Sequence, residues 1–174
     1  MGRKNNMMLK KIYDPHILGF QEAYSTEELC EKTFRPIVDL LQDRKICCPC
    51  DSKKSEIVKW LTKNTNSEII NFCNLDIIGE KAQTKMLGYL VITDPPFDKR
   101  VLEPFVEWLL DTKTDFLILS PFYNYDYRTK YPVLEYKVQQ SPKMKHKLID
   151  GSTHYVTGRW ITNLEEIKER SIYG

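Results

Sequence analysis

The fold prediction starts from the stretch Val91-Ile92-Thr93-Asp94-Pro95-Pro96-Phe97. The apolar run from Leu87 to Thr93 predicts a buried strand, and the prolines that follow predict its end, because proline gives no backbone N–H to a sheet. A carboxylate and an aromatic ring therefore stand at the carboxyl end of a buried strand, where ligands bind in open α/β sheets. The alternative to a ligand-binding position is an ordinary strand end at which prolines stop the strand.

Further apolar runs predict strands at 45–50, 68–73 and 115–120. Periodic segments before and between these strands predict three helices. The first starts at a capping box from Ser25 and is kinked or split at Pro36. The second is capped by Asp51 or Ser52, and the third has Pro104 in its first turn. Strands that alternate with helices form a parallel, helix-covered sheet. We therefore predict an α/β fold with a mostly parallel central sheet and flanking helices.

The carboxyl-terminal part of the chain carries different signals. Residues 121–144 show no period and are rich in Tyr, Lys and Pro, which predicts an extended surface excursion. A turn signal at Asp150-Gly151-Ser152 and a strand at 155–161 predict a hairpin, and a capping box at Thr162 predicts a terminal helix. The predicted organisation is an arm over 1–19 and a single domain over 20–174, with a basic, Tyr-rich excursion over 121–147.

Length and composition exclude several classes of protein. The 174 residues suffice for one hydrophobic core, and no apolar run approaches the roughly 18 residues of a spanning helix. The amino-terminal residues lack the apolar core of a secretory signal, so we expect a cytoplasmic protein without membrane contact. Five cysteines without an export signal are expected to be free thiols, with Cys47-Cys48-Pro49-Cys50 largely in a buried strand. No second ligand pair accompanies this cluster and the histidines are distant in sequence, so no metal site is expected.

The net charge of +2 hides a polarised distribution. Residues 1–11 carry four basic and no acidic groups, whereas 128–147 carry six basic groups and one acidic group. These segments sum to +9, so the rest of the chain carries −7, as in a nucleic-acid binder with an acidic reverse side. Tyrosines beside the second segment suit base stacking. The alternative is a solvated loop whose tyrosines pack on the core. The candidate nucleic-acid-binding residues are Tyr123, Tyr125, Arg128, Lys130, Lys143, Lys145 and Lys147.

The string Asp94-Pro95-Pro96-Phe97 suits chemistry on an exocyclic amine such as N6 of adenine, whose lone pair is delocalised into the ring. The Asp94 carboxylate and the Pro95 carbonyl can each accept one N–H bond, and their stabilising effect grows as positive charge develops on the nitrogen. Prolines keep backbone donors away from a place that needs acceptors. Phe97 is expected to stack on a base that is flipped out or single-stranded, with Tyr123 as a clamp opposite it.

Four blocks resemble the S-adenosylmethionine-dependent N6-adenine DNA methyltransferases, and more closely the EcoRI-type family common in bacteriophages. They cover about Gln21 to Glu165. The blocks are Gln21-Glu22-Ala23-Tyr24-Ser25-Thr26 with Arg35-Pro36-Ile37 after it, Cys48-Pro49-Cys50-Asp51 with Ser55-Glu56-Ile57-Val58-Lys59 behind it, Asp94-Pro95-Pro96-Phe97, and Arg159-Trp160-Ile161-Thr162-Asn163-Leu164. The third matches the catalytic tetrapeptide of amino-group methylation.

The resemblance implies a Rossmann-like methyltransferase fold that uses S-adenosylmethionine to methylate N6 of adenine in DNA. It implies that a phage encodes the enzyme to protect its DNA against restriction, and that it acts in the host cell cytoplasm. The implied catalytic residues are Asp94, Pro95, Pro96 and Phe97, and the implied cofactor-binding residues are Tyr24, Ser25, Thr26, Pro49, Cys50 and Asp51, with Asp76 near the cofactor adenine or ribose.

The chain departs from common cofactor patterns in two respects. No glycine-rich turn follows the first predicted strand, and no acidic residue directly follows Phe72-Cys73-Asn74 to bind ribose hydroxyls. Asp51 has the alternative role of a helix cap. Few residues follow the predicted strand at 115–120, so little of the chain is available to read a DNA sequence. We therefore expect a short recognition sequence, or a homodimer whose two subunits share the recognition. The alternative functions are methylation of RNA or protein amide, and a catalytically silent module that binds nucleic acid or a host protein.

Overall fold

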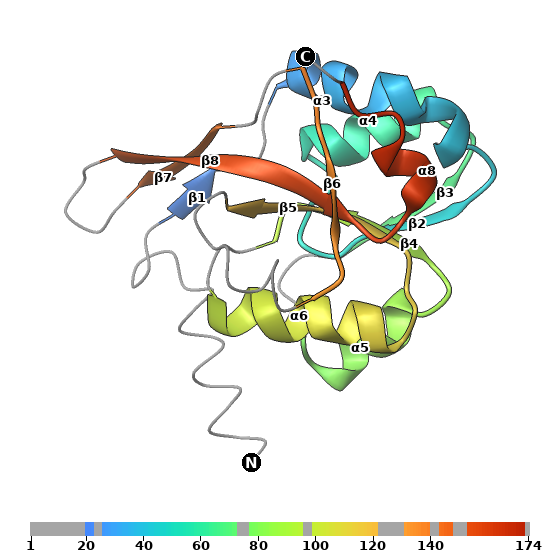
Figure 1. The fold of residues 1–174 in the computed structure, drawn as a ribbon, viewed down its shortest axis with the longest axis vertical. Helices are drawn as coiled ribbons and strands as arrows, with labels where there is room; N and C mark the ends of the chain where they lie inside the picture. Colours follow the sequence, from blue (N-terminus) through green and yellow to red (C-terminus); the bar gives the residue numbers. More distant parts are fainter. Residues whose placement is uncertain are drawn as a thin grey trace.

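The computed structural model describes residues 20–22, 26–72, 77–95, 99–121, 131–139, 143–147 and 153–172. Helices cover both faces of a mixed sheet, which confirms the α/β class (Figure 1). No helix within these ranges is long and apolar enough to span a bilayer. The helices are α3 (Glu27–Phe34), the 3-10 helix η1 (Arg35–Leu41), α4 (Glu56–Asn64), α5 (Glu80–Met86), α6 (Lys99–Asp111) and α8 (Glu165–Lys168). The strands are β1 (Phe20–Glu22), β2 (Lys45–Cys48), β3 (Glu68–Asn71), β4 (Leu90–Thr93), β5 (Phe116–Pro121), β6 (Leu134–Tyr136), β7 (Lys143–Lys147) and β8 (Thr153–Thr162).

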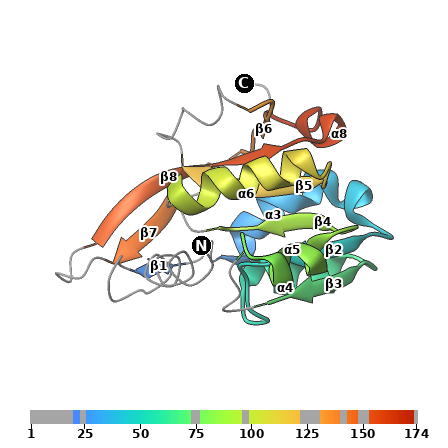
Figure 2. The same ribbon diagram turned by 90° about the horizontal axis from the view of Figure 1, so that it is seen from below.

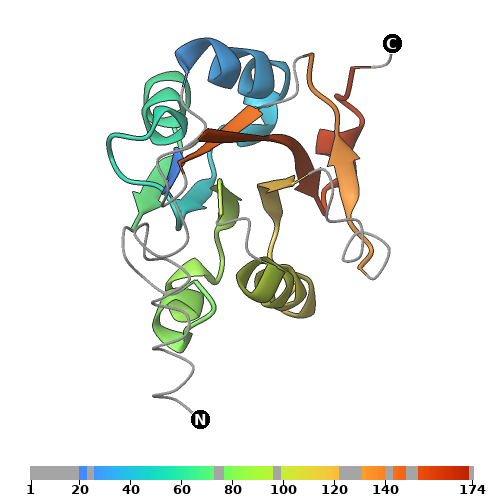
Figure 3. The same cartoon turned by 90° about the vertical axis from the view of Figure 1, so that its left-hand side faces the viewer.

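The centre of the sheet consists of four parallel strands in the order β3-β2-β4-β5. The chain moves outward from β2 through α4 to β3, and returns through α5 past β2 to β4. Helix α4 covers one face of the sheet, whereas α5 and α6 cover the other (Figures 1 and 3). The segments that leave β2 and β4 therefore diverge to opposite faces, and ligands bind at such a topological switch point.

Alternate residues of the parallel strands enter two apolar layers. Ile46 of β2 belongs to the layer that contains Phe34 and Trp60 of α3 and α4. The next residue, Cys47, belongs to the layer that contains Phe105 of α6. This alternation follows the two-residue period of a strand. All four residues of β4 are buried, as expected for a strand that is covered on both faces.

The strand β8 joins the parallel half of the sheet to an antiparallel extension. Gly158 of β8 lies opposite Pro121, the last residue of β5. Residues 153–157 continue past that point and pair antiparallel with β7, to which β1 adds a third strand. At about 3.3 Å per residue, this β7–β8 hairpin projects roughly 16 Å past the carboxyl end of β5. Figures 1 and 2 show the projection.

The predicted carboxyl-terminal hairpin agrees with the β7–β8 pairing, although its turn residues lie outside the described ranges. The prediction of an aperiodic excursion over 121–144 is wrong in part, because it contains β6, which pairs with β8. Three residues are too few to show a strand period. Tyr136 of β6 is buried, and its hydroxyl donates a 2.6 Å hydrogen bond to the carbonyl of Thr33. Helix α5 was also not predicted.

The helix starts differ from those predicted by their capping signals. Thr26 rather than Ser25 caps α3, and its hydroxyl accepts the Leu29 N–H at 3.2 Å. Ser55 rather than Asp51 or Ser52 caps α4 in the same way. Each predicted cap stands near another hydroxyl residue, so local sequence offers several starts and tertiary packing selects one.

The prolines have different effects on the helices. The predicted kink at Pro36 is confirmed, because α3 ends at Phe34 and η1 continues the chain with tighter turns. Pro104 is inside α6 and not in its first turn, because α6 begins at Lys99. The expected cap at Thr162 is also corrected, since Thr162 ends β8 and Leu164 occupies the cap position of α8.

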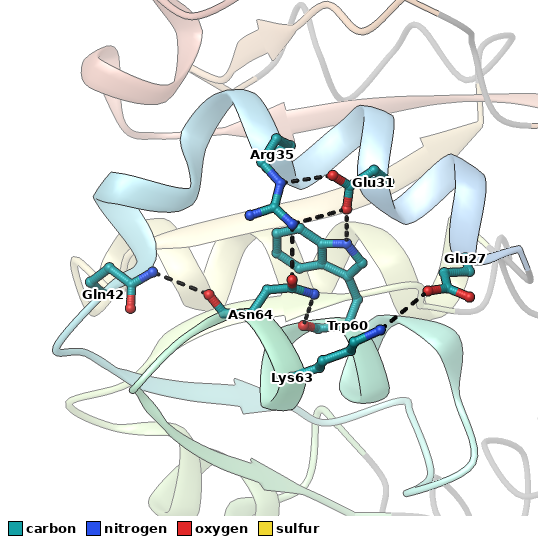
Figure 4. A network of polar contacts seen from close by, with 7 residues as sticks. All are labelled: Glu27, Glu31, Arg35, Gln42, Trp60, Lys63 and Asn64. Carbon is teal, nitrogen blue, oxygen red and sulfur yellow. Dashed lines mark hydrogen bonds and ion pairs between the residues drawn. The ribbon is translucent and has the colours of Figure 1, made fainter.

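A polar network around Trp60 fixes α3 on α4 (Figure 4). The indole N–H of Trp60 donates to Oε2 of Glu31 at 2.7 Å. The guanidinium of Arg35 lies 5.0 Å from the indole ring centre and donates to Oε1 of Glu31 at 2.7 Å. Nη2 of the same guanidinium donates to Oδ1 of Asn64 at 2.9 Å. One indole ring thus receives a hydrogen-bond acceptor at its edge and a cation over its face, which fixes the orientation of the helix pair.

Replacement of Tyr136 by Phe should lower the free energy of unfolding by about 1–2 kcal/mol, because a buried hydrogen bond to Thr33 is lost. Urea denaturation measures the effect. Tyr131→Phe is the matched control, since its hydroxyl binds Glu107 at the exposed surface at 3.1 Å and should contribute less than about 0.5 kcal/mol. Equal losses in the two variants would contradict the importance of burial.

Candidate functional site

Asp94 and Pro95 follow β4 directly and are buried, with Asp94 only 7% exposed. They lie at the carboxyl end of β4, at the switch point between β2 and β4. The predicted position of this carboxylate at a strand end is thereby confirmed. Pro96 and Phe97, the remaining predicted catalytic residues, lie outside the described ranges.

The turn that follows β2 is bound to the end of β4 through Thr93. The hydroxyl of Thr93 accepts the N–H of Cys50 at 3.0 Å and donates to Oδ2 of Asp51 at 2.7 Å. Both interactions join residues that are more than 40 positions apart in sequence. The two strand ends at the switch point therefore form one hydrogen-bonded unit.

The carboxylate of Asp51 is the centre of this unit and is only 2% exposed. Its second oxygen accepts the hydroxyl of Ser55 at 3.2 Å, and the backbone N–H of Asp94 donates to the carboxylate as well. Burial raises the pKa of Asp51 to about 6, while the hydrogen bonds from Thr93, Ser55 and the Asp94 backbone oppose that rise. Asp51 is therefore ionised at neutral pH and held by donors of the protein itself.

Several thiols surround the two carboxylates. Burial raises the pKa of the Cys50 thiol well above its usual value, and the charges of Asp51 and Asp94 add to the effect. Burial also raises the pKa of Cys30 in α3 to about 12, with contributions from Glu56 and Asp51. The thiols stay protonated at neutral pH. Cys30 of α3 also belongs to the same apolar cluster as Cys48 at the end of β2.

The predicted cofactor residues are only partly described. Pro49 is buried in the turn, Cys50 is half-buried beside Asp94, and Asp51 lies beneath the turn. Thr26 caps α3 and is exposed. Tyr24, Ser25 and Asp76 lie outside the described ranges. The structure thus gathers three of these residues at the switch point, and gives Asp51 a role other than helix capping.

The carboxyl-terminal block that resembles the family serves the packing of the sheet. Trp160 is fully buried and stacks edge-on against Phe34 at 5.6 Å. The Asn163 amide accepts the N–H of Phe116 and donates to the carbonyl of Thr114, both at 2.9 Å. These contacts lie at the start of β5, at the opposite end of the strand from the switch point. Trp160 and Asn163 of this block therefore stabilise the fold.

Three of the predicted nucleic-acid-binding residues, Lys143, Lys145 and Lys147, belong to β7 in the projecting hairpin. Alternation along a strand puts positions 143, 145 and 147 on one face of β7. In the strand order β7-β8-β5-β4, β7 is displaced sideways from β4 by three strand spacings, or about 14 Å, and the projection of the hairpin past β5 adds to the separation. These basic positions and Asp94 thus lie at the same edge of the sheet. Tyr123, Tyr125, Arg128 and Lys130 lie outside the described ranges.

The sequence prediction missed Thr93, Ser55 and Asn71. Thr93 and Ser55 hold Asp51, and their hydroxyls gave no recognisable signal because their partner is fixed by the fold. Asn71 ends β3 beside Cys48 and is half-buried at the position where many nucleotide-binding sheets carry an acidic residue.

Within the described ranges no three His, Cys, Asp or Glu side chains gather to hold a metal ion.

Comparison with known proteins assigns the chain to no family. No family model and no curated protein matches it. A solved structure, the crystal structure of Thermoplasma acidophilum 1320, is similar over 95% of this chain and 99% of its own, with 14% sequence identity and a TM-score of 0.49.

Replacement of Asp51 by Asn should change how stability depends on pH. The ordinary pKa of 3.8 describes the unfolded chain, whereas the folded carboxyl titrates at about 6. The folded state binds more protons between these values, so the Asp51 contribution to stability falls as the pH rises through this range, by roughly 3 kcal/mol in total. The variant does not titrate. Its unfolding free energy, relative to the native chain, should therefore increase by most of that amount, roughly 2.4 kcal/mol, from pH 4 to pH 7.

Chemical denaturation at several pH values measures this difference. Asp39→Asn is the control, because the Arg170 guanidinium lowers the pKa of Asp39 at the surface. Loss of that carboxylate should make the variant relatively less stable as the pH rises, which is the opposite sign. A pH-independent difference for Asp51→Asn would contradict the raised pKa.

Proposed function

We propose that this protein transfers a methyl group from S-adenosylmethionine to the N6 amino group of adenine in DNA, on a Rossmann-like methyltransferase fold. The observation that carries the proposal is the position of Asp94-Pro95. This acceptor pair is buried at the carboxyl end of β4 and is joined through Asp51 to the turn after β2. A switch point with carboxylate and carbonyl acceptors suits a ligand beside an amine substrate.

The two acceptors fit the chemistry of an amine nucleophile. The Asp94 carboxylate and the Pro95 carbonyl each accept one N–H bond of the amine, which directs the nitrogen lone pair away from the ring. When the nitrogen becomes positively charged during transfer, both hydrogen bonds strengthen. The carboxylate then accepts the proton that the nitrogen must lose. Pro95 has no N–H, so it offers the site only an acceptor.

The residues at the switch point fit S-adenosylmethionine. When bound, this cofactor supplies a methyl group on a positively charged sulfur, which two nearby carboxylates, Asp94 and Asp51, stabilise electrostatically. Pro49 and Cys50 in the turn after β2 are the residues that would hold it, and Asn71 at the end of β3 offers an amide for a ribose hydroxyl. Thr26, which the resemblance places among the cofactor-binding residues, lies at the exposed start of α3.

The basic hairpin supports DNA as the acceptor. Lys143, Lys145 and Lys147 lie on the strand that projects past the same edge of the sheet as Asp94. Lysines in this position can contact phosphates on either side of a base that is delivered to Asp94. A flipped or single-stranded adenine satisfies the need to expose N6. Phage-encoded protection against restriction is the corresponding biological role.

Replacement of Asp94 by Ala should abolish methyl transfer, with a loss of at least roughly 100-fold in kcat, because the developing positive charge loses its acceptor. The assay uses tritiated S-adenosylmethionine with unmethylated DNA, RNA or a protein mixture as parallel acceptors. Calorimetry should show that cofactor binding survives. Asp111→Ala, an exposed aspartate on α6, is the matched control.

The acceptor that becomes labelled in this assay identifies the substrate class of the protein. Label only on RNA or on protein would replace DNA as the acceptor class. Label on none of them, together with no cofactor binding, would favour a silent binding module over an enzyme. Loss of cofactor binding in the Asp94 variant would make Asp94 a cofactor-binding or structural residue.

Joint replacement of Lys143, Lys145 and Lys147 by Ala should weaken DNA binding and reduce the slope of log affinity against log salt by up to about three, one for each lost phosphate contact. Fluorescence anisotropy at several salt concentrations measures the slope. Joint replacement of Lys59, Lys63 and Lys168, on helices α4 and α8, removes the same charge and should leave the slope nearly unchanged. An unchanged slope for the hairpin variant would remove β7 from the interface.

A further inference from the structure

The Asp51 carboxylate joins its own turn to two segments that meet at the switch point, the end of β4 and the cap of α4. It accepts the Thr93 hydroxyl from the end of β4, the Ser55 hydroxyl from the cap of α4, and the N–H of Asp94. Its 2% exposure leaves almost no surface for a ligand. These contacts differ from those of a cofactor-binding residue, which needs an open acceptor or donor.

We propose that Asp51 is a positioning residue, which fixes the backbone at Asp94 and thereby aims the Asp94 carboxylate and the Pro95 carbonyl. Thr93 completes the arrangement, because it donates to Asp51 while it accepts the N–H of Cys50. The turn after β2 and the acceptor pair after β4 consequently move as one unit. The catalytic consequence rests on the proposed function, whereas the link between Asp51 and Asp94 does not.

The backbone at Asp94 needs a separate hydrogen-bond acceptor because β4 ends just before it. The last ladder pair of β4 joins Thr93 to Ile118, so Asp94 is the first residue beyond the parallel sheet. A charged acceptor makes a stronger hydrogen bond to a backbone N–H than a carbonyl does, particularly when it is shielded from water. The buried carboxylate thus holds the first residue after the strand.

Several ionisable side chains surround the Asp51 carboxylate. They are the thiols of Cys30 in α3, Cys47 and Cys48 in β2 and Cys50 in the turn, all raised in pKa, and the carboxylate of Asp94 itself. The thiols remain protonated across the acidic range. Among the described groups, the charges at this place are therefore carried by the carboxylates of Asp51 and Asp94, with Glu56 acting on Cys30 from the start of α4.

Amide NMR of the intact protein tests the link without any assay of activity. The N–H resonance of Asp94 should shift with pH, with a midpoint near 6, as the Asp51 acceptor becomes ionised. Asp94→Asn keeps this N–H and removes the side-chain carboxyl of residue 94. The shift should persist in that variant and should disappear in Asp51→Asn. A shift that vanishes in Asp94→Asn, or that persists in Asp51→Asn, would overturn the proposal.

Variants of Thr93 provide a second measurement if Asp51→Asn fails to fold. Thr93→Val removes the hydroxyl at nearly constant volume, and Thr93→Ser restores it. Where methyl transfer is measured, Thr93→Val should lower kcat by roughly 10- to 100-fold with a smaller change in the KM for S-adenosylmethionine, because a misaimed acceptor acts on the reacting nitrogen. Thr93→Ser should recover most of kcat.

The outcomes separate this proposal from the proposed function. A native chain without methyl transfer but with the expected titration of the Asp94 N–H refutes the enzyme and retains the positioning role of Asp51. Methyl transfer without that titration does the reverse. Equal kcat in Thr93→Val and the native chain would show that the network supports stability alone.

Discussion

The register of β8 is the constraint on which the sheet depends. A slip by one residue would exchange its two faces, and neighbouring residues of β8 enter opposite apolar layers, Trp160 in one and Ile161 in the other. A Cβ atom at Gly158 would stand only 3.1 Å from Leu119, so a larger residue does not fit there without movement of Leu119. Hydrogen bonds of the Asn163 amide to Phe116 and Thr114, at the start of β5, fix the far end of β8. The parallel strands, β6 and the projecting hairpin all take their positions from this register.

The sequence predicts the parallel half of the fold well and the remainder less well. β4 is predicted because four buried residues form an uninterrupted apolar run, and the kink at Pro36 because proline cannot continue an α-helix. β6 is missed because its three residues carry no period and gain their stability from pairing with β8. The cap of α4 is misplaced because Asp51 has the chemistry of a cap but is engaged by Thr93.

The candidate site can also be predicted from the sequence only in part. Asp94-Pro95 can be predicted because a carboxylate and prolines after an apolar run mark a strand end. The interaction of Asp51 with Thr93 and the N–H of Asp94 cannot be predicted, since it joins residues that only the strand order β2-β4 brings together. The same holds for the hairpin: the basic composition is visible in the sequence, whereas its position relative to Asp94 follows from the pairing of β8 with β5 and β7.

The turn after β2 has a consequence for the kind of ligand that this edge of the sheet can accept. Glycine-rich turns at such positions present free N–H groups to the phosphates of dinucleotides and nucleoside triphosphates. Here the N–H of Cys50 is taken by Thr93, and that of Asp51 by the carbonyl of Cys48 at 3.3 Å. The carboxylate of Asp51 adds negative charge beneath the turn, which disfavours anions. These two N–H groups are therefore not available to a phosphate, unlike those of a glycine-rich turn.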